Sequence, residues 1–435
     1  MINILPLSDT LHRIESTKLV KQKHNFAIST LQLSEKEVYL YPKNQRKEME
    51  SFYRTHAYLV EHTNAPVRRD LMDEINWGDR LIGIKGTRGV GKTTFLLQYA
   101  KEKFGTDRSC LFINMNNFYF SGHSLVDFAN EFQRRGGKVL LIDQVFKHPD
   151  WSKELRMCYD RFPNLKIVFT GSSVMRLKEE NLELCDIVKS YNLRGLSFRE
   201  FLNLQTGMKF RAYSLEEILS NHEQIAKGIL SKVRPMDFFQ DYLHHGFYPF
   251  FLEKRNFSEN LLMVEVDILL IKQIELKYLS KIKKLLYLLA VDGPKAPNVS
   301  QLATDIETSR ATVMNYIKYL ADARMINLVY PKGEEFPKKP SKIMMHNSNL
   351  MYSIYPVKVE EQDVLDTFFV NTMWKDHKVH KGDKNISFMV DEVMPFKICC
   401  EGVKIKNNPG VTYALHKAEI GRENQIPLWM FGLLY

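Results

Sequence analysis

Residues 80–98 read RLIGIKGTRGVGKTTFLLQ, and this stretch decides the fold of the first half of the chain. An apolar run that begins at Leu81 is typical of a buried strand, and the run that follows the glycines is typical of a helix. Glycines let the backbone curl so that successive N–H groups face an anion, and the N-terminus of the next helix adds the positive end of its dipole. The stretch therefore predicts a phosphate-binding loop over Gly86–Thr94.

The glycine turn matches the pattern G-x-x-x-x-G-K-[ST], in which the side chains after the last glycine also have defined tasks. Lys92 is expected to reach the β- and γ-phosphates of ATP. Thr93 is expected to offer its hydroxyl to Mg²⁺, which prefers hard oxygen ligands. Because the pattern lies between a strand and a helix, ATP and Mg²⁺ are the predicted cofactors.

Two later strands are expected to bring polar groups to the same edge of the sheet. The apolar run VLLIDQV ends in Asp143, which predicts an acid where ligands bind in an open α/β sheet and a partner for Mg²⁺ through water. The run IVFTGSS adds Thr170, Ser172 and Ser173, whose hydroxyls could sense the γ-phosphate, although a plain turn explains them nearly as well. The predicted nucleotide contacts are Gly86, Thr87, Arg88, Gly89, Val90, Gly91, Lys92, Thr93, Thr94, Asp143 and Ser172, with Thr93 and Asp143 as metal ligands.

Strand and helix patterns alternate from Arg80 to Ser173, which predicts an α/β domain with a parallel sheet and crossover helices. At 435 residues the chain is long enough for two or three domains. The predicted order is an N-terminal extension (1–60), a P-loop ATPase core (61–205), a helical lid or connector (206–274), a winged helix-turn-helix (275–340) and a small α+β unit (341–435).

The winged-helix prediction rests on a helical run, a short helix at 299–306, a tight turn, and a longer helix at 310–325 that precedes a strand. The formal net charge of +10 makes an anionic partner such as DNA or RNA reasonable, because a basic surface attracts phosphate backbones. Winged helices also serve as packing modules, so the two interpretations stay open. The candidate nucleic-acid contacts are Arg310, Asn315, Lys318, Lys332, Lys338 and Lys339.

Composition narrows the class of protein further. Hydrophobic residues make up 44% of the chain, which fits globular domains. No apolar run approaches the roughly 20 residues that cross a bilayer, so no membrane association is expected and the cytoplasm is the expected compartment.

The five cysteines lack the spacing of a zinc site or of a disulfide framework. His244 and His245 have no acid or cysteine at ligand spacing, and the aromatic run at 247–251 is expected to lie in the core.

The chain resembles bacterial AAA-type ATPases that carry a winged-helix region and a restriction-endonuclease-like domain of unknown function at the C-terminus. The resemblance rests on the P-loop segment, on KVLLIDQVFKHPDWSKEL, KIVFTGSSVMRL and LRGLSFREFL, and on HHGFYPFF, KIMMHNSNLMYSI and IPLWMFGLLY further along. It covers nearly the whole chain after residue 60. It implies ATP binding and hydrolysis, a winged helix and a nuclease-like fold.

Two departures from that family bear on hydrolysis. Gln144 follows Asp143, where family members usually have the Glu that polarises the attacking water. A neutral amide orients water but cannot accept its proton, and a missing general base typically costs about 10²–10⁴-fold in rate. Asp186 and Ile187 stand where an arginine pair is usual. Arg88 and Arg194 remain as substitutes, although each is also explained as a structural arginine.

The C-terminal unit departs in the same direction. By position, the metal-binding residues of the nuclease-like members fall on Asp366, Ser387, Lys397 and Glu401, so that only the first stays acidic in its place. Glu401 and Lys404 could imitate a shifted pair, but the metal would still lack a ligand at Ser387. This predicts a fold retained without cleavage.

Three hypotheses for function follow. The first is a nucleotide-dependent switch with slow hydrolysis, in which Lys92 and Gln144 are the catalytic residues. The second is an active ATPase coupled to DNA handling or defence, with Gln144 orienting water. The third is a winged-helix nucleic-acid-binding protein whose P-loop is a relic. Whether the chain acts as a homo-oligomer is left open.

Overall fold

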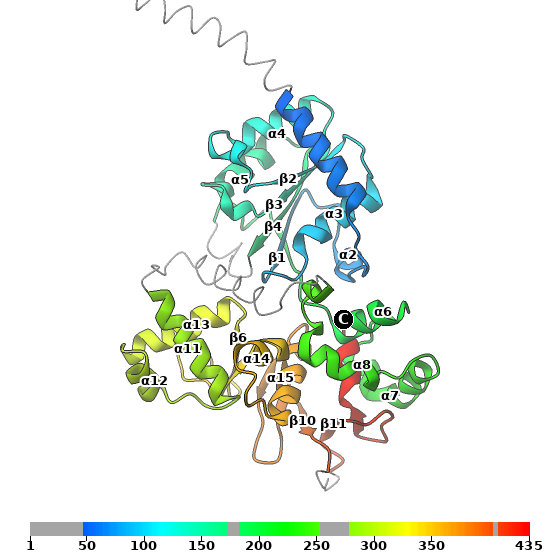
Figure 1. Ribbon diagram of the computed structural model, residues 1–435, viewed down its shortest axis with the longest axis vertical. Coiled ribbons are helices and arrows are strands. Elements are labelled where there is room, and N and C mark those ends of the chain that lie inside the picture. The colour runs from blue at the N-terminus through cyan, green and yellow to red at the C-terminus, as the bar shows by residue number, and fades with distance from the viewer. Residues whose placement is uncertain (1–46, 173–181, 253–277, 403–407) are drawn as a thin grey trace, which may run out of the picture.

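The computed structural model describes residues 47–172, 182–252, 278–402 and 408–435, and Figure 1 shows them as an α/β body above a second, mixed body. The α/β body contains five strands that are paired in parallel throughout, in the spatial order β2-β3-β4-β1-β5. The predicted parallel sheet of a P-loop NTPase is confirmed. The strands are β1 (Leu81–Gly86), β2 (Cys110–Asn114), β3 (Val139–Asp143), β4 (Lys166–Ser172) and β5 (Lys189–Asn192).

Helices cover both faces of this sheet, because each parallel connection must cross from one end of the sheet to the other. Alternate residues of β3 point to opposite faces, so that Leu141 joins one buried cluster while Leu140 and Ile142 join another. The helices of this body are a helix over residues 47–62, α2 (Leu71–Glu74), α3 (Lys92–Lys103), α4 (Leu125–Arg134) and α5 (Trp151–Arg161).

The chain leaves β5 through Gly195 and enters α6 (Phe198–Thr206), whose first turn is closed by a reciprocal pair of bonds. The Ser197 side chain accepts from the Glu200 N–H, and the Glu200 carboxylate accepts from the Ser197 N–H, which is the capping-box arrangement. The helical segments that follow are α7 (Leu215–Leu230), α8 (Met236–Asp241), the π-turn η3 (Tyr242–Gly246) and η4 (Pro249–Leu252).

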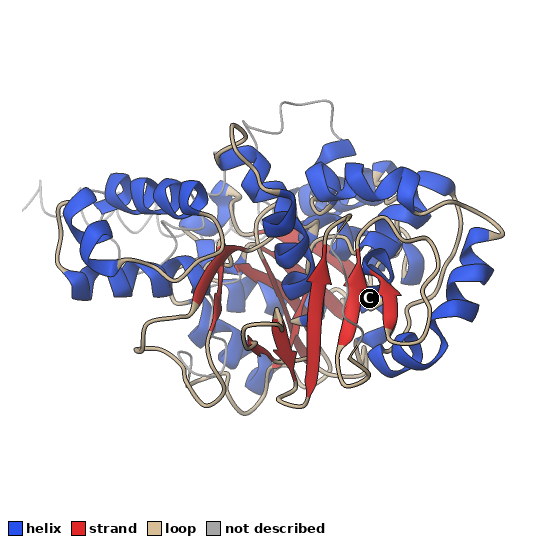
Figure 2. Ribbon diagram, turned by 90° about the horizontal axis from the view of Figure 1, so that it is seen from below, coloured by secondary structure: helices blue, strands red, loops and turns tan. Residues whose placement is uncertain are grey.

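These helices lie beside the C-terminal end of the chain (Figure 1), and Figure 2 shows that end among strands and helices. The Tyr213 N–H donates to the Leu433 carbonyl at 3.0 Å, and His222 Nε2 lies 2.9 Å from the Glu423 carbonyl oxygen. The described part of the predicted lid or connector, 206–252, therefore packs on the C-terminal unit, and the rest of that prediction lies outside the described residues.

Residues 278–345 form three helices followed by an antiparallel pair of strands, with Ile326 opposite Met345. Ser309 accepts from the Thr312 N–H and so begins the third helix. The assignment of this unit as a winged helix remains a prediction. The elements are α11 (Leu279–Asp292), α12 (Val299–Asp305), α13 (Arg310–Asp322), β6 (Ile326–Val329) and β7 (Lys342–Met345).

The last unit is mixed α/β, with a five-stranded sheet in the order β12-β11-β10-β9-β8. Strand β10 pairs in parallel with β11 and antiparallel with β9. Strand β12 ends at Pro427, and the aromatic residues that follow it form η6 (Leu428–Leu433), a buried 3₁₀ helix. The other elements are α14 (Ser348–Ile354), α15 (Glu361–Met373), β8 (Val379–Lys381), β9 (Phe388–Val390), β10 (Met394–Cys399), β11 (Thr412–Leu415) and β12 (Gln425–Pro427).

One hydrophobic cluster runs from the α3 face of the first sheet to the C-terminus, so the two bodies share a continuous core. Two buried arginines join them across this core. Arg69 Nε donates to Glu200 Oε1 at 2.9 Å, and Arg199 donates to Asp70 Oδ2 and to the Tyr435 carbonyl. In the described parts of the chain, no helix is long and apolar enough to span a membrane.

We expect Glu200→Gln to destabilise the fold by about 3–5 kcal/mol, because it leaves the Arg69 guanidinium buried without its counter-ion. Glu217→Gln is the matched control, since Glu217 is also the third residue of a capping box but pairs with Arg211 at the surface. That control should change stability little. Urea unfolding followed by circular dichroism measures both, and equal losses in the two variants would contradict the role given to the buried pair.

Candidate nucleotide-binding site

The Gly86–Thr94 loop connects β1 to α3 and depends on its glycines. Gly89 and Gly91 adopt φ angles of 83° and 92°, in the left-handed region that glycine enters without strain. At Gly86 an added Cβ would lie 2.4 Å from the Leu193 carbonyl oxygen. The loop is therefore closed tightly against the β5 connection, and only a residue without a side chain fits at Gly86.

Lys92 begins α3, and its ammonium group lies within the curl of the loop. Nζ donates to the carbonyls of Gly86 and Thr87, at 2.8 Å each. Both acceptors are neutral, whereas phosphate oxygens are charged and make stronger hydrogen bonds with an ammonium group. The lysine is thus held close to the position from which a bound phosphate would attract it.

Asp143 is the centre of a hydrogen-bonded group at the carboxyl end of the sheet. Its side chain is almost fully buried, with 1% of the residue exposed. Thr93 Oγ1 donates to Oδ2 at 2.9 Å and Thr170 Oγ1 donates to Oδ1 at 2.6 Å. Asn114 Nδ2 donates to Oδ2 at 2.9 Å. The hydroxyl of Thr93 and the carboxylate of Asp143, predicted as metal ligands from distant parts of the sequence, therefore lie in direct contact, and this oxygen set fits Mg²⁺.

Gln144 follows Asp143 in a left-handed conformation, with φ 55° and ψ 47°. Its backbone N–H donates to Thr170 Oγ1 at 2.9 Å, so the Thr170 hydroxyl connects Gln144 with Asp143. This bond fixes the backbone at the position where the resembling family has its general base. A side chain at this position leaves the sheet at the same edge as Asp143.

The other predicted contacts fall around the loop. Thr87 and Val90 are buried, Arg88 is exposed, and Thr94 lies on the first turn of α3. The backbone of Ser172 lies opposite Gly86 in the β1–β4 register. Ser173 lies outside the described residues.

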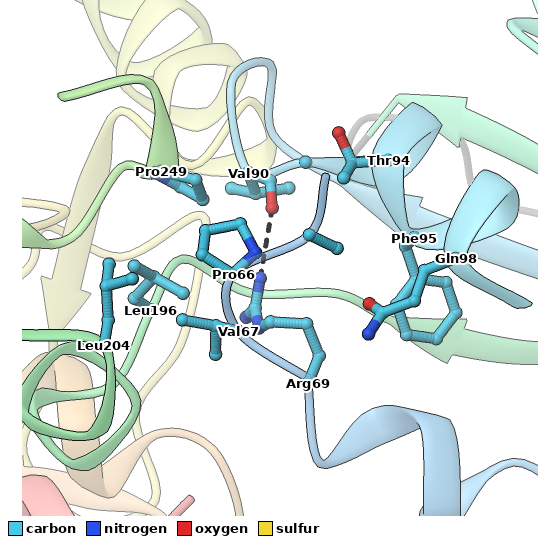
Figure 3. Close-up of a pocket in the computed structure, with 12 residues that line it drawn as sticks. Pro66, Val67, Arg69, Val90, Thr94, Phe95, Gln98, Leu196, Leu204 and Pro249 are labelled. Atoms are coloured by element: carbon cyan, nitrogen blue, oxygen red, sulfur yellow. Dashed lines mark hydrogen bonds between the residues drawn. The ribbon is translucent and has the colours of Figure 1, made fainter. Parts of the chain in front are cut away.

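A pocket opens beside the loop, between α3 and the segment that precedes α2 (Figure 3). It encloses about 430 Å³ of empty space, part of which is open to solvent. Its lining is largely apolar, as is usual for small-molecule pockets. The lining residues are Ala65, Pro66, Val67, Arg69, Val90, Gly91, Thr94, Phe95, Gln98, Leu196, Leu204 and Pro249.

Residues 246–251, GFYPFF, cross the outer side of the loop, and we call this segment the aromatic strap. An added Cβ at Gly89 would lie 2.6 Å from Phe250 Cε1, and one at Gly91 would lie 3.8 Å from Pro249 Cγ. Phe250 stacks on Tyr248 with ring centroids 5.1 Å apart. The run was expected to be core, and it is partly buried, but it also contacts the phosphate-binding loop.

The other side of the strap is hydrogen-bonded to the N-terminal end of α14. Asn347 Nδ2 donates to the Tyr248 hydroxyl at 3.1 Å, while Asn347 Oδ1 caps α14. Asn349 Oδ1 accepts from the Phe247 N–H at 2.9 Å. A short chain of contacts therefore leads from Gly89 through the strap to α14.

The arginine candidates have structural partners. Arg194 donates to the carbonyls of Asn371 and Trp374 and lies over the Tyr435 ring, so it connects the first body with the C-terminal unit. Arg88 is exposed on the loop, and its part in catalysis remains a prediction. Asp186, at the place of the usual arginine pair, is bonded to Arg156. Ile187 packs against the core on the far face of the sheet.

The basic residues of the predicted winged helix divide into two groups. Lys318 pairs with Asp322 and lies over the Phe336 ring, while Lys332 pairs with Glu392 and Lys338 with Glu334. Arg310, Asn315 and Lys339 are exposed. Half of the predicted nucleic-acid contacts thus already have partners within the chain.

The acids expected from the nuclease-like resemblance are also bonded to neighbours. Asp366, 5% exposed, is 3.2 Å from Lys342 Nζ and accepts from Gln362, and its pKa is raised because it is buried. Ser387 Oγ accepts from the Ile398 N–H. Glu401 pairs with Lys417, Lys397 is partly buried, and Lys404 lies outside the described residues.

Within the residues that the structure describes, no group of three or more His, Cys, Asp or Glu side chains is arranged to hold a metal ion. His244 stacks on Tyr352 with ring centroids 3.7 Å apart, and its pKa is lowered because it is partly buried. The ammonium group of Lys342 is the cation that Asp366 contacts.

Comparison with known proteins supports the assignment of the first body. Residues 78–202 match the family described as an AAA domain. Residues 78–202 form an AAA-type P-loop NTPase domain. Residues 236–358 match a second family, described as a domain of unknown function (DUF8612), which includes the aromatic strap and α14.

An uncharacterized protein of Methanocaldococcus jannaschii is 29% identical over 273 residues, which is 58% of this chain and 57% of that protein. This chain thus matches less than two thirds of its relative's length. Among solved structures, the matches include Aeropyrum pernix ORC1 in complex with DNA (10% identity, 71% of this chain and 92% of that chain, TM-score 0.29). AMPPCP-bound DnaA from Aquifex aeolicus is another (13% identity, 58% and 86%, TM-score 0.24).

Sequence patterns missed two parts of this site. Asn114 is the last residue of β2 and lies opposite Asp143 in the strand register, so a polar residue at the end of a buried strand was the available signal. Arg69 lines the pocket and donates to the Val90 carbonyl from a segment without regular pattern. No sequence signal indicated that 65–69 would lie beside the loop.

Proposed function

We propose that this protein binds ATP with Mg²⁺ and acts as a nucleotide-dependent switch with slow hydrolysis. The observation that carries the proposal is the contact between Thr93 and Asp143, 50 residues apart in sequence and 2.9 Å apart in space, beside the ammonium of Lys92. A glycine turn that occurred by chance would not be expected to come with both partners of a metal site.

The phosphates would lie against the backbone N–H groups of the Gly86–Thr94 loop, with Lys92 at the β- and γ-phosphates. The pocket beside the loop continues from Gly91 and Thr94, so it suits the nucleobase. Its apolar lining favours a flat aromatic ring over water.

Thr93 and Asp143 would hold Mg²⁺, which supplies charge neutralisation at the phosphates. Gln144 leaves the backbone next to Asp143, where its amide can orient water but cannot accept a proton. Asp186 and Ile187 stand in place of an arginine pair, and the cations within the described loop itself are Lys92 and Arg88. These features support nucleotide retention over rapid turnover.

The aromatic strap supports a route by which an occupied loop would affect the rest of the chain. Phe250 lies against Gly89, and Tyr248 and Phe247 are bonded to Asn347 and Asn349 of the α14 region. Any displacement of the loop by phosphate would press on the strap, because an interior packed at this density transmits small shifts. The switch hypothesis therefore has a specific path from the loop to α14.

We expect Mg²⁺ and ATP together to raise the melting temperature. A ligand that binds only the native state stabilises it by about 2.7 kcal/mol at a hundredfold excess over Kd. Lys92→Ala should abolish the shift, and Lys101→Ala, on the same helix but bonded to carbonyls of 61 and 63, should keep it. Differential scanning fluorimetry with and without EDTA measures this. A wild type whose melting temperature ignores ATP would disprove nucleotide binding.

We expect ATP to change hydrogen exchange in the backbone of α14, and Tyr248→Phe to reduce that change while ATP binding persists. This variant removes the hydroxyl that accepts from Asn347 but keeps the ring on Phe250. Tyr355→Phe, at the end of α14 and packed on Tyr287, is the control. If ATP leaves α14 exchange unaltered in the wild type, the strap does not transmit the nucleotide state.

We expect Gln144→Glu to speed hydrolysis, because it places a carboxylate of nearly equal volume where a general base is missing. The gain should fall below the full factor of about 10²–10⁴ if the missing arginine pair also limits the transition state. Phosphate release at saturating ATP, with Lys92→Ala as background, gives the rate. A wild type that already turns over at about 1 s⁻¹ or faster, with Gln144→Glu no better, would favour an active ATPase over a switch.

A further inference from the structure

We propose that Gln98 selects the nucleobase, by presenting its side-chain carbonyl to the exocyclic amino group of adenine and disfavouring bases that have a carbonyl at that position. The inference rests on the proposed nucleotide site and names a specificity-determining residue within it. The observation behind it is the orientation of the Gln98 side-chain amide, which contacts Glu102, which in turn contacts Arg68.

Gln98 is one of three polar side chains in a pocket otherwise lined by apolar groups and backbone. It lies one turn after Thr94 on α3, so the two side chains share a face of the helix. Figure 3 shows the Gln98 amide on the side of the pocket opposite Pro66 and Val67. The edge of a planar base in this pocket would therefore face the Gln98 amide.

Arg69, the charged residue of the pocket, has most of its hydrogen-bonding capacity in use. Nε donates to Glu200, one terminal nitrogen donates to the Val90 carbonyl, and the other donates to the carbonyls of Arg194 and Gly195. These bonds occupy four of the five N–H groups of a guanidinium. Arg69 is thus held as part of the wall, which leaves Gln98 and Thr94 as the polar side chains of the pocket that can recognise a base.

Glu102 sets which end of the Gln98 amide faces the pocket. Gln98 Nε2 lies 3.1 Å from Glu102 Oε1, and an ionised carboxylate can only accept, so the group that faces it must be the NH₂. The other carboxylate oxygen of Glu102, Oε2, accepts from Arg68 Nε at 3.2 Å. The contact with Glu102 therefore assigns which end of the Gln98 amide is the NH₂ and which is the carbonyl oxygen.

The Gln98 carbonyl oxygen is consequently the end of the amide left for a ligand, and no hydrogen bond to it from another described residue is present. Gln98 as a whole residue is 8% exposed, so a bound base would separate this acceptor from water. Adenine has an amino group that donates to such an oxygen. Guanine and hypoxanthine have a carbonyl oxygen at the same ring position, and two acceptors facing each other in a shielded site would leave both without a partner.

The experiment compares ATP with ITP, which differs from ATP only where the amino group becomes a carbonyl and the adjacent ring nitrogen gains a hydrogen. Dissociation constants for both nucleotides with Mg²⁺ are measured by isothermal titration calorimetry on the full chain. The wild type should prefer ATP by roughly 5- to 150-fold, the range that one unpaired buried group produces. Gln98→Met, of similar volume and without the acceptor, should weaken ATP and bring the two affinities close to equal.

Two further variants test the orientation argument. Glu102→Gln replaces a pure acceptor by an amide that can also donate, so the Gln98 amide can turn, and the preference for ATP should shrink without loss of binding. Gln133→Met makes the same substitution on α4, away from the pocket, and should keep the wild-type ratio.

The outcomes separate this inference from the function on which it rests. ATP and ITP binding with equal affinity to the wild type, or an unchanged ratio in Gln98→Met, would overturn the role of Gln98 alone. Failure of both nucleotides to bind the wild type would overturn the proposed nucleotide site and this inference with it. An ATP preference that disappears in Gln98→Met and narrows in Glu102→Gln supports the assignment.

Discussion

The buried ion pair between Arg69 and Glu200 is the constraint on which the site depends. A guanidinium in an apolar interior is tolerated only where its donors are satisfied, and Arg69 reaches this state by bonding to Glu200 and to three backbone carbonyls. Those carbonyls belong to the phosphate-binding loop and to the connection after β5. The segment before α2, the loop and the start of α6 are consequently fixed relative to one another, and the pocket proposed for the base lies between them.

The same region also connects the AAA-type domain to the units that follow it in the chain. Arg199, the residue before Glu200 on α6, is bonded to Asp70 and to the carbonyl of Tyr435. The aromatic strap adds a second connection, because it contacts Gly89 on one side and the α14 region on the other. In such an arrangement, a change at the loop on nucleotide binding would reach the α14 region through only a few residue contacts.

Whether a feature of the site could be predicted depends on how far apart in sequence the interacting residues are. The loop was predictable because the glycines, Lys92 and Thr93 act within one strand–turn–helix unit, where spacing in sequence fixes spacing in space. Asp143 was predictable because a fully apolar strand ends at it, and the carboxyl ends of parallel strands share one edge. Asn114 carried the same kind of signal in β2. The strap, by contrast, looked like ordinary core, since aromatic composition does not distinguish a core residue from one that packs on a loop.

The sequence by itself determined the P-loop NTPase fold of the first body and the position of its glycine loop, because both are encoded in local patterns of apolar residues and glycine. Only the tertiary structure decided the partners of Arg69, the packing of residues 206–252 on the C-terminal unit, and the orientation of Gln98. The physical reason is that each depends on groups more than a few residues apart, or on the acceptor and donor capacity of a neighbour. Glu102 is only one helical turn from Gln98, yet its effect on the amide matters because Pro66, Val67 and Leu196 close a pocket around it.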